Sequence, residues 1–185
     1  MCRVTIEEVR CAICQRDRAL TREHVFARWL TQRVGAAGPA RVIASVCAEC
    51  NAGWMSTLEV AFRRLLTAPR AGVIAAPDRT ALARWFTKTA MLVADAQGAA
   101  LVPSEARPAL MRGMPEGIEV FIARRRRPAA SRLGHARNSD GSVAVSVDDL
   151  IAHVAPDGVL ASRHGTRLWP LRTHALRWDT LPLVS

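Results

Sequence analysis

Apolar residues recur at the spacing of one helical face in two stretches of the chain. The first runs from Asn51 to Thr67, and Pro69 follows its end. Its apolar positions are Trp54, Met55, Leu58, Ala61, Phe62, Leu65 and Leu66. The second begins at Pro77-Asp78, with Asp78 suited to cap the first turn, and continues to Ala94. Because such a face packs on a core, we predict two amphipathic helices here.

Shorter patterns before the first of these helices predict two strands and a short helix. Residues 41–46 alternate and are rich in β-branched side chains, which is typical of a strand that would run into Cys47. A short strand around residues 19–21 would lead to His24. Residues 27–33 favour a helix. Glycine and proline would end that helix, at Gly35, Gly38 and Pro39.

The chain after residue 70 has a pattern of its own, with a further short helix expected over residues 104–114. Strands are predicted at residues 118–123, 142–147, 159–162 and 167–171. A loop rich in Gly, Ser, Asn and Asp would separate the first two strands. The order of helices and strands indicates an α+β fold in two parts, residues 1–70 and residues 71–185.

The composition allows a packed core and favours a polyanionic partner. Half of the 185 residues are hydrophobic, and the formal net charge is +10. Lys88 is the only lysine, however, and a high-GC coding bias can supply arginines without selection for binding. The run Arg124–Arg127 fits phosphate contacts and fits a solvated strand end equally well. The charge therefore favours nucleic acid without establishing it.

Targeting and membrane signals are missing from the sequence pattern. The N-terminal residues are charged from Arg3 onward, without the apolar segment of a secretory signal. The apolar run Ala90–Ala94 is far shorter than the roughly 20 residues of a membrane-spanning helix. We expect no membrane partner and a cytoplasmic location.

Four of the five cysteines form two pairs with the spacing CxxC. The pairs are Cys11 with Cys14 and Cys47 with Cys50. In a reducing compartment such pairs are typical of zinc ligands, and four thiolates make a closed structural site. The alternative is four buried or redox-active thiols without a metal. Cys2 is left over, and we interpret it as a bystander near the terminus.

The residues between and just after the two pairs resemble the HNH endonuclease superfamily. Between the pairs stands Thr21-Arg-Glu23-His24-Val25, and Asn51 follows Cys50 directly. The closest-looking subset of this family carries CxxC, then Thr-x-Glu-His, then CxxCN. The resemblance covers about the first third of the chain. It implies a ββα-metal module clamped by zinc, followed by a small mixed α/β accessory region.

Carried over to this sequence, the resemblance implies a catalytic role for three residues. His24 would be the general base that activates water, and Glu23 and Asn51 would hold a catalytic Mg²⁺ or Mn²⁺. The chemistry is sensible, because imidazole is a base near neutral pH and a cation offsets charge on the phosphorane. A carboxylate and an amide oxygen are hard ligands suited to these cations.

The sequence departs from the family pattern at three places, one of which is Asn51 where the last motif position is otherwise His, and other interpretations remain open. Ala27 stands where the family often has proline, and residues 36–46 offer no counterpart of the middle asparagine. His24 is alternatively an ordinary histidine after a glutamate, and Asn51 a helix N-cap. Ser56 and Glu59 are interpreted as helix-surface residues. No role is assigned to the remaining histidines, which are His135, His153, His164 and His174.

The function that these observations favour is that of an HNH-type endonuclease, a metal-dependent hydrolase of DNA phosphodiester bonds. DNA is the expected partner, and RNA is possible chemically. The alternative is a catalytically inactive module that uses the zinc core to bind nucleic acid or another protein. Retention of Glu23, His24 and Asn51 together argues against the alternative, because binding alone requires none of them.

Overall fold

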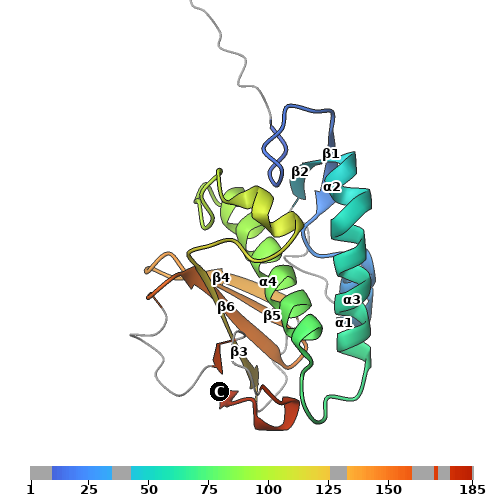
Figure 1. Ribbon diagram of the computed structural model, residues 1–185, viewed down its shortest axis with the longest axis vertical. Helices are drawn as coiled ribbons and strands as arrows, with labels where there is room; N and C mark the ends of the chain where they lie inside the picture. The colour runs from blue at the N-terminus through green and yellow to red at the C-terminus, as the bar shows by residue number, and fades with distance from the viewer. Residues whose placement is uncertain (1–9, 35–42, 126–132, 160–168, 171–175, 185) are drawn as a thin grey trace, which may run out of the picture.

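The computed structural model describes residues 10–34, 43–125, 133–159, 169–170 and 176–184. These residues form a mixed α/β structure with several helices and two sheets, whose strands are mostly antiparallel (Figure 1). The coarse expectation of helices combined with antiparallel strands is thereby confirmed. No described helix has the length and apolar character that crossing a membrane requires.

The smaller sheet is a pair of strands, β1 (Leu20–His24) and β2 (Ile43–Cys47), with α1 (Arg28–Val34) between them in sequence. The strands are antiparallel, and Glu23 lies opposite Ala44. All three elements were predicted, although β1 continues further, to His24. The residues expected to end α1 (Gly35, Gly38 and Pro39) lie outside the described residues.

The predicted helix after the second cysteine pair starts earlier and is irregular at first. A single turn, α2 (Ala48–Cys50), leads into a distorted turn over Asn51–Met55 in which Gly53 leaves helical geometry. Regular helix follows in α3 (Ser56–Thr67), and Ala68 is extended, which ends it as expected. The buried face of α3 consists of Leu58, Phe62, Leu65 and Leu66.

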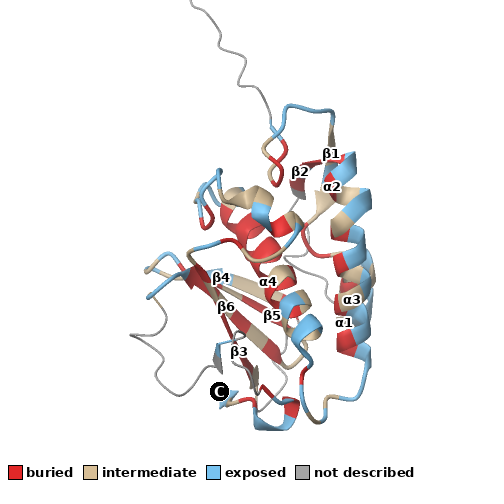
Figure 2. Cartoon of the chain, viewed as in Figure 1, coloured by how far each residue is buried: buried red, intermediate tan, exposed pale blue. Residues whose placement is uncertain are grey.

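The long helix α4 (Ala76–Ala96) lies between α3 and the larger sheet (Figure 1). Helices packed on two sides need apolar residues all round, and residues 82–83 and 85–94 of α4 are all buried (Figure 2). The prediction that Asp78 caps this helix is wrong. The helix begins at Ala76 without a side-chain cap, so Asp78 lies inside the first turn and pairs with Arg64 of α3.

The larger sheet has six strands in the order β4-β5-β6-β3-β7, with β8 parallel to β3. The strands are β3 (Ile118–Arg125), β4 (Leu133–Arg137), β5 (Val143–Val147), β6 (Leu150–Pro156), β7 (Trp169–Pro170) and β8 (Leu183–Val184). Short 3₁₀ helices span Arg107–Met111 and Trp178–Thr180.

Two of the predicted strands in this half are confirmed, as β3 and β5. The helix expected over residues 104–114 is a short 3₁₀ helix. The sequence pattern missed β6, and β4 lies in the stretch expected to be a loop. The strand predicted at residues 167–171 is confirmed in its described part, which is β7 (Trp169–Pro170). Of the strand predicted at residues 159–162, only Val159 is described, and it is in a turn.

One buried cluster joins both halves of the chain. It extends from Cys11 in the N-terminal part to Leu181 near the other end. At its centre, Phe62 of α3 stacks on Trp85 of α4 with ring centroids 3.6 Å apart. The boundary at residue 70 stays a prediction, and any movement of one half against the other must disturb this shared core.

Candidate functional site

The first cysteine pair lies in a tight turn that the backbone itself closes. The amide of Cys11 donates to the carbonyl of Arg16 at 3.1 Å, and the amide of Gln15 donates to that of Cys11 at 3.0 Å. Gln15 has a positive φ of 59°, and its side-chain amide donates to the carbonyls of Cys11 and Ala12. These bonds hold an otherwise unfavourable backbone conformation and fix where the two thiols point.

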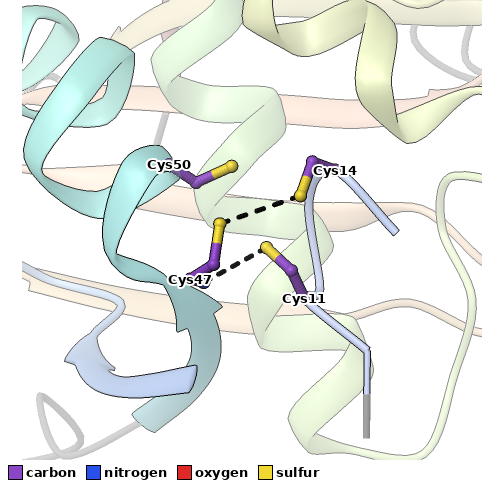
Figure 3. Close-up of side chains that lie close together, drawn as sticks. All are labelled: Cys11, Cys14, Cys47 and Cys50. Carbon is purple, nitrogen blue, oxygen red and sulfur yellow. Dashed lines mark hydrogen bonds between the residues drawn. The ribbon is translucent and has the colours of Figure 1, made fainter. Parts of the chain in front are cut away.

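The second pair lies at the end of β2 and in α2, directly opposite the first (Figure 3). The amide of Ala12 donates a hydrogen bond of 3.0 Å to the carbonyl of Ser45, and this bond attaches the turn to β2. All four thiols are buried, and their Sγ atoms lie within 4.8 Å of one another. The Sγ atoms of Cys14 and Cys47 are 3.8 Å apart. Tetrahedral zinc with bonds of about 2.3 Å places its sulfurs roughly 3.8 Å apart, so this cluster has the size that zinc requires.

The protein environment prepares these thiols unequally for ionisation. Burial raises the pKa of Cys14 and of Cys50. Burial also opposes ionisation of Cys11, but backbone N–H groups of Cys47, Cys14 and Ile13 outweigh it and lower its pKa to about 7. Four thiolates packed this closely need a cation to balance their charge. The four cysteines thus can hold a zinc ion, as their spacing predicted.

Glu23 and Asn51 come together next to this centre. Thr21 and Glu23 share one face of β1, since side chains alternate along a strand. Asn51, in the turn after α2, donates from Nδ2 to Glu23 Oε2 at 2.9 Å and to Thr21 Oγ1 at 3.4 Å. The N-cap reading of Asn51 is wrong, because its own backbone is helical and Cys47 precedes the first turn.

A pocket of about 470 Å³ opens around this contact. It is lined by Thr21, Glu23, Ala48, Asn51, Ala52, Met55, Ser56, Glu59 and Lys88. Its walls therefore come from β1, from the turn that follows the second cysteine pair, and from the two long helices. Two carboxylates, an amide, two hydroxyls and one ammonium face the same space.

The interpretation of Glu59 as a helix-surface residue is wrong. Its Oε1 accepts hydrogen bonds from Lys88 Nζ and from Trp85 Nε1, each at 2.7 Å, and its Oε2 accepts one from Trp29 at 3.3 Å. Lys88 is only 2% exposed. Neither residue was a candidate in the sequence. The available signal was the position of the sole lysine within the apolar pattern of the second helix.

His24 does not line the pocket with Glu23. The two residues are consecutive in β1, so their side chains point to opposite faces of the strand. His24 is half-buried at the last position of the strand, and the described residues offer its ring no hydrogen bond. The structure thus brings Glu23 and Asn51 together and leaves His24 on the other side of the hairpin.

Within the described ranges, no arginine, lysine or histidine side chain other than Lys88 lines this pocket. Arg124 lies in β3 and donates to Asp149 at 2.8 Å, while Arg126 and Arg127 lie outside the described residues. His135 stacks on Phe26, with ring centroids 6.0 Å apart.

Comparisons with family models, with curated proteins and with solved structures find no match for this chain. The HNH resemblance therefore depends on the motif residues alone and stays a prediction.

Proposed function

We propose that this chain is a metal-dependent endonuclease of the HNH type that hydrolyses DNA phosphodiester bonds. The observation that carries the proposal is the contact of 2.9 Å between Glu23 and Asn51 in a polar pocket. The pocket wall continues into the turn that carries Cys47 and Cys50. A catalytic cation held by oxygen ligands and a structural zinc held by thiolates would then occupy neighbouring sites.

The donor set of the pocket suits a hard divalent cation. Carboxylate oxygens and amide oxygens, completed by water, are the usual ligands of Mg²⁺ and Mn²⁺. Asn51 turns its Nδ2 toward Glu23, and half a turn of the amide presents Oδ1 in the same direction. Such a cation would offset the negative charge on the phosphorane and on the leaving oxygen.

The four-thiol centre would take no part in the reaction and would only hold the residues of this site in place. Asn51 follows Cys50 directly, and the pair Glu23–Ala44 lies on the strands that the first cysteine turn docks against. Zinc binding would fix the turn, the end of β2 and the start of α2 relative to one another. Asn51 would thereby be held against Glu23.

His24 is the proposed general base, from the opposite face of β1. In an in-line displacement the attacking water and the leaving oxygen lie on opposite sides of phosphorus. A base on one side of the strand end and a cation on the other are compatible with a phosphodiester that lies across this end. Proton transfer by such a base contributes roughly 10²- to 10⁴-fold in rate.

The first experiment is incubation of purified protein with plasmid DNA, with and without Mg²⁺ or Mn²⁺. Brief EDTA treatment should stop cleavage without unfolding the protein, because oxygen ligands release their cation more readily than thiolates release zinc. Added Mg²⁺ or Mn²⁺ should restore cleavage. Glu23→Ala and Asn51→Ala should each abolish that rescue, and cleavage that survives both substitutions would remove the cation from the proposal.

The role of His24 is tested on the same substrate. His24→Ala should retain zinc and the far-UV spectrum of the wild type but lower cleavage by at least ~10²-fold. Arg22→Ala is the matched control, since Arg22 is exposed on the same face of β1. Equal losses in the two variants would indicate an electrostatic surface effect instead of a base.

One observation favours a second candidate, a catalytically inactive nucleic-acid-binding module. His24 and the Glu23–Asn51 contact lie on different faces, as a binding module that needs no base would tolerate. No cleavage of DNA or RNA with any divalent cation, together with DNA binding that weakens steeply with salt, would establish this candidate.

A further inference from the structure

Lys88 is a buried charge at the wall of the pocket that holds Glu23 and Asn51. Its side chain comes from the middle of α4, which lies beyond the part of the chain that carries the HNH-like motif. It is 2% exposed and pairs with Glu59 at 2.7 Å. A cation so deep in a protein is costly to desolvate, and this cost needs a reason.

Clamping α3 to α4 is a weak reason for the pair. Buried ion pairs are often no more stabilising than well-packed apolar residues of similar volume. The two helices already have an apolar contact at this level, where Phe62 stacks on Trp85 and Phe86 packs edge-on against both rings. An apolar residue in place of Lys88 would extend this contact without desolvating a charge.

The residue type at position 88 also indicates a role beyond stability. Every other basic residue among the 26 lysines and arginines is an arginine, so the composition favours arginine wherever only a positive charge is needed. Lysine differs in being a compact point charge with three donors that can rotate. A site that must place one charge against one oxygen uses this property.

The hydrogen bonding of Lys88 leaves donors for a ligand. Among the described residues its Nζ has one hydrogen-bond acceptor, Glu59 Oε1, and its charge lies 5.3 Å from the centre of the Trp85 ring. Glu59 is in turn fixed by the two indoles of Trp85 and Trp29. This arrangement holds the ammonium in place and leaves two of its three N–H donors without an acceptor from the described residues.

We propose that Lys88 contacts the phosphodiester in this pocket and offsets the charge that develops on its non-bridging oxygens. The inference rests on the proposed function, because it assigns a further residue to the same site. The cation held by Glu23 and Asn51 and the ammonium of Lys88 would then approach one phosphate from different walls. Glu59 is a positioning residue, which keeps Lys88 extended toward the pocket.

Binding is tested by the one side-chain ammonium signal that the chain offers. Protein labelled with ¹⁵Nζ-lysine gives a single lysine side-chain resonance, since Lys88 is the only lysine. The probe is the dinucleoside phosphate thymidylyl-thymidine in Mg²⁺-free buffer, and its neutral methylphosphonate analogue is the matched control. The Lys88 signal should shift with the charged diester and stay in place with the neutral one.

Catalysis is tested with the small diester bis(p-nitrophenyl) phosphate, which lacks the bases and flanking phosphates that arginines could bind. Lys88→Met should lower kcat by at least ~10²-fold, the usual effect of removing one group that stabilises transition-state charge. Lys88→Arg should recover part of it. The control is Arg64→Met, which removes an ion pair between the same two helices outside the pocket.

The outcomes separate the two proposals. Wild-type cleavage with an unresponsive Lys88 signal and unchanged kcat in Lys88→Met overturns the role of Lys88 and leaves the endonuclease standing. A Lys88 signal that shifts only with the charged diester, in a protein that cleaves nothing, overturns the endonuclease and supports Lys88 as a phosphodiester contact. If Lys88→Met does not fold, the signal of the wild type alone decides.

Discussion

The imidazole of His135 connects the larger sheet to the segment after β1. It stacks on the buried ring of Phe26, and its Nδ1 is buried without a partner among the described residues. Burial lowers its pKa below the ordinary value of 6.5. Protonation therefore places an unpaired charge against the buried ring of Phe26.

This predicts a loss of stability on acidification. Well above pH 6.5 His135 is neutral in the folded and unfolded chains, and its contribution to stability does not change. As the pH falls below 6.5, the unfolded chain binds a proton that the folded chain resists, so the free energy of unfolding decreases. The decrease ends once the pH is below the lowered pKa of the folded state.

Urea unfolding at pH 7 and pH 5.5 measures the effect, with His135→Phe as the comparison. Phenylalanine keeps a ring against Phe26 and cannot titrate. The free energy of unfolding should fall less between the two pH values in His135→Phe than in the wild type. An identical fall in both proteins would assign the acid sensitivity to other groups.

Single residues of the candidate site were predictable to different degrees. Glu23 and Asn51 could be paired from the sequence because the HNH resemblance assigns both residues to one cation. Glu59 could not, since it lies beside the apolar face of α3 and its partner Lys88 arrives from another helix. The spacing of apolar residues within one helix predicts which face of that helix is buried. It does not predict a charged side chain that a second helix brings to the same face.

At the scale of elements, the turn between Cys11 and Gln15 and the junction of β2 with α2 depend on one another. Ile13 buries its side chain in the core, and backbone hydrogen bonds to Arg16 and Ser45 hold the turn in place. The contact among the four thiols is what joins the turn to Cys47 and Cys50. Zinc binding would therefore contribute directly to the free energy of folding of this part of the chain.

Cys47→Ser should accordingly lose zinc and destabilise the chain strongly, with the hairpin and the first turn affected most. Elemental analysis should find about one zinc per chain in the wild type, and the variant should be depleted. Cys2→Ser is the control, because this cysteine is outside both pairs. Well-folded wild-type protein that contains no zinc would contradict the assignment of the four-thiol centre.

The elements that were missed show where sequence patterns fail. β4 contains Gly134 and adjoins a segment rich in turn residues, so its composition is that of a loop. It is a strand because it pairs with β5, where Gly134 lies against Ser146, and a Cβ at Gly134 would be 3.1 Å from Oγ of that serine. β6 pairs on one edge with β5, its neighbour in the chain, and on the other edge with β3, which is distant in sequence. The second pairing depends on a long-range contact that a local pattern does not contain.

At the scale of the whole molecule, α4 contacts elements of both halves of the chain. One side packs on α3 and β2, and the other packs on the larger sheet (Figure 1). The pocket also crosses the boundary predicted at residue 70, since Lys88 completes its wall. The two halves should therefore fold together, although the sequence divides into two patterns.

Equilibrium unfolding in urea tests this with two signals from one sample. Tryptophan fluorescence reports the five tryptophans together, of which Trp85 is fully buried between α3 and α4. Release of zinc to a coloured chelator reports the cysteine centre. Both signals should change at the same urea concentration, since loss of the cysteine centre removes β2 and α2 from the face of the shared core.

The contrary outcome has a clear meaning. Zinc release well before the change in fluorescence would make residues 1–70 a separate unit, and a fragment of those residues should then fold alone with zinc. Coincident transitions predict that the same fragment does not, because it exposes part of the buried face of α3, where Phe62 stacks on Trp85 of α4 in the full chain. Burying a side chain such as Phe62 is worth roughly 1.5–3 kcal/mol, and the fragment lacks the helix that buries it in the full chain.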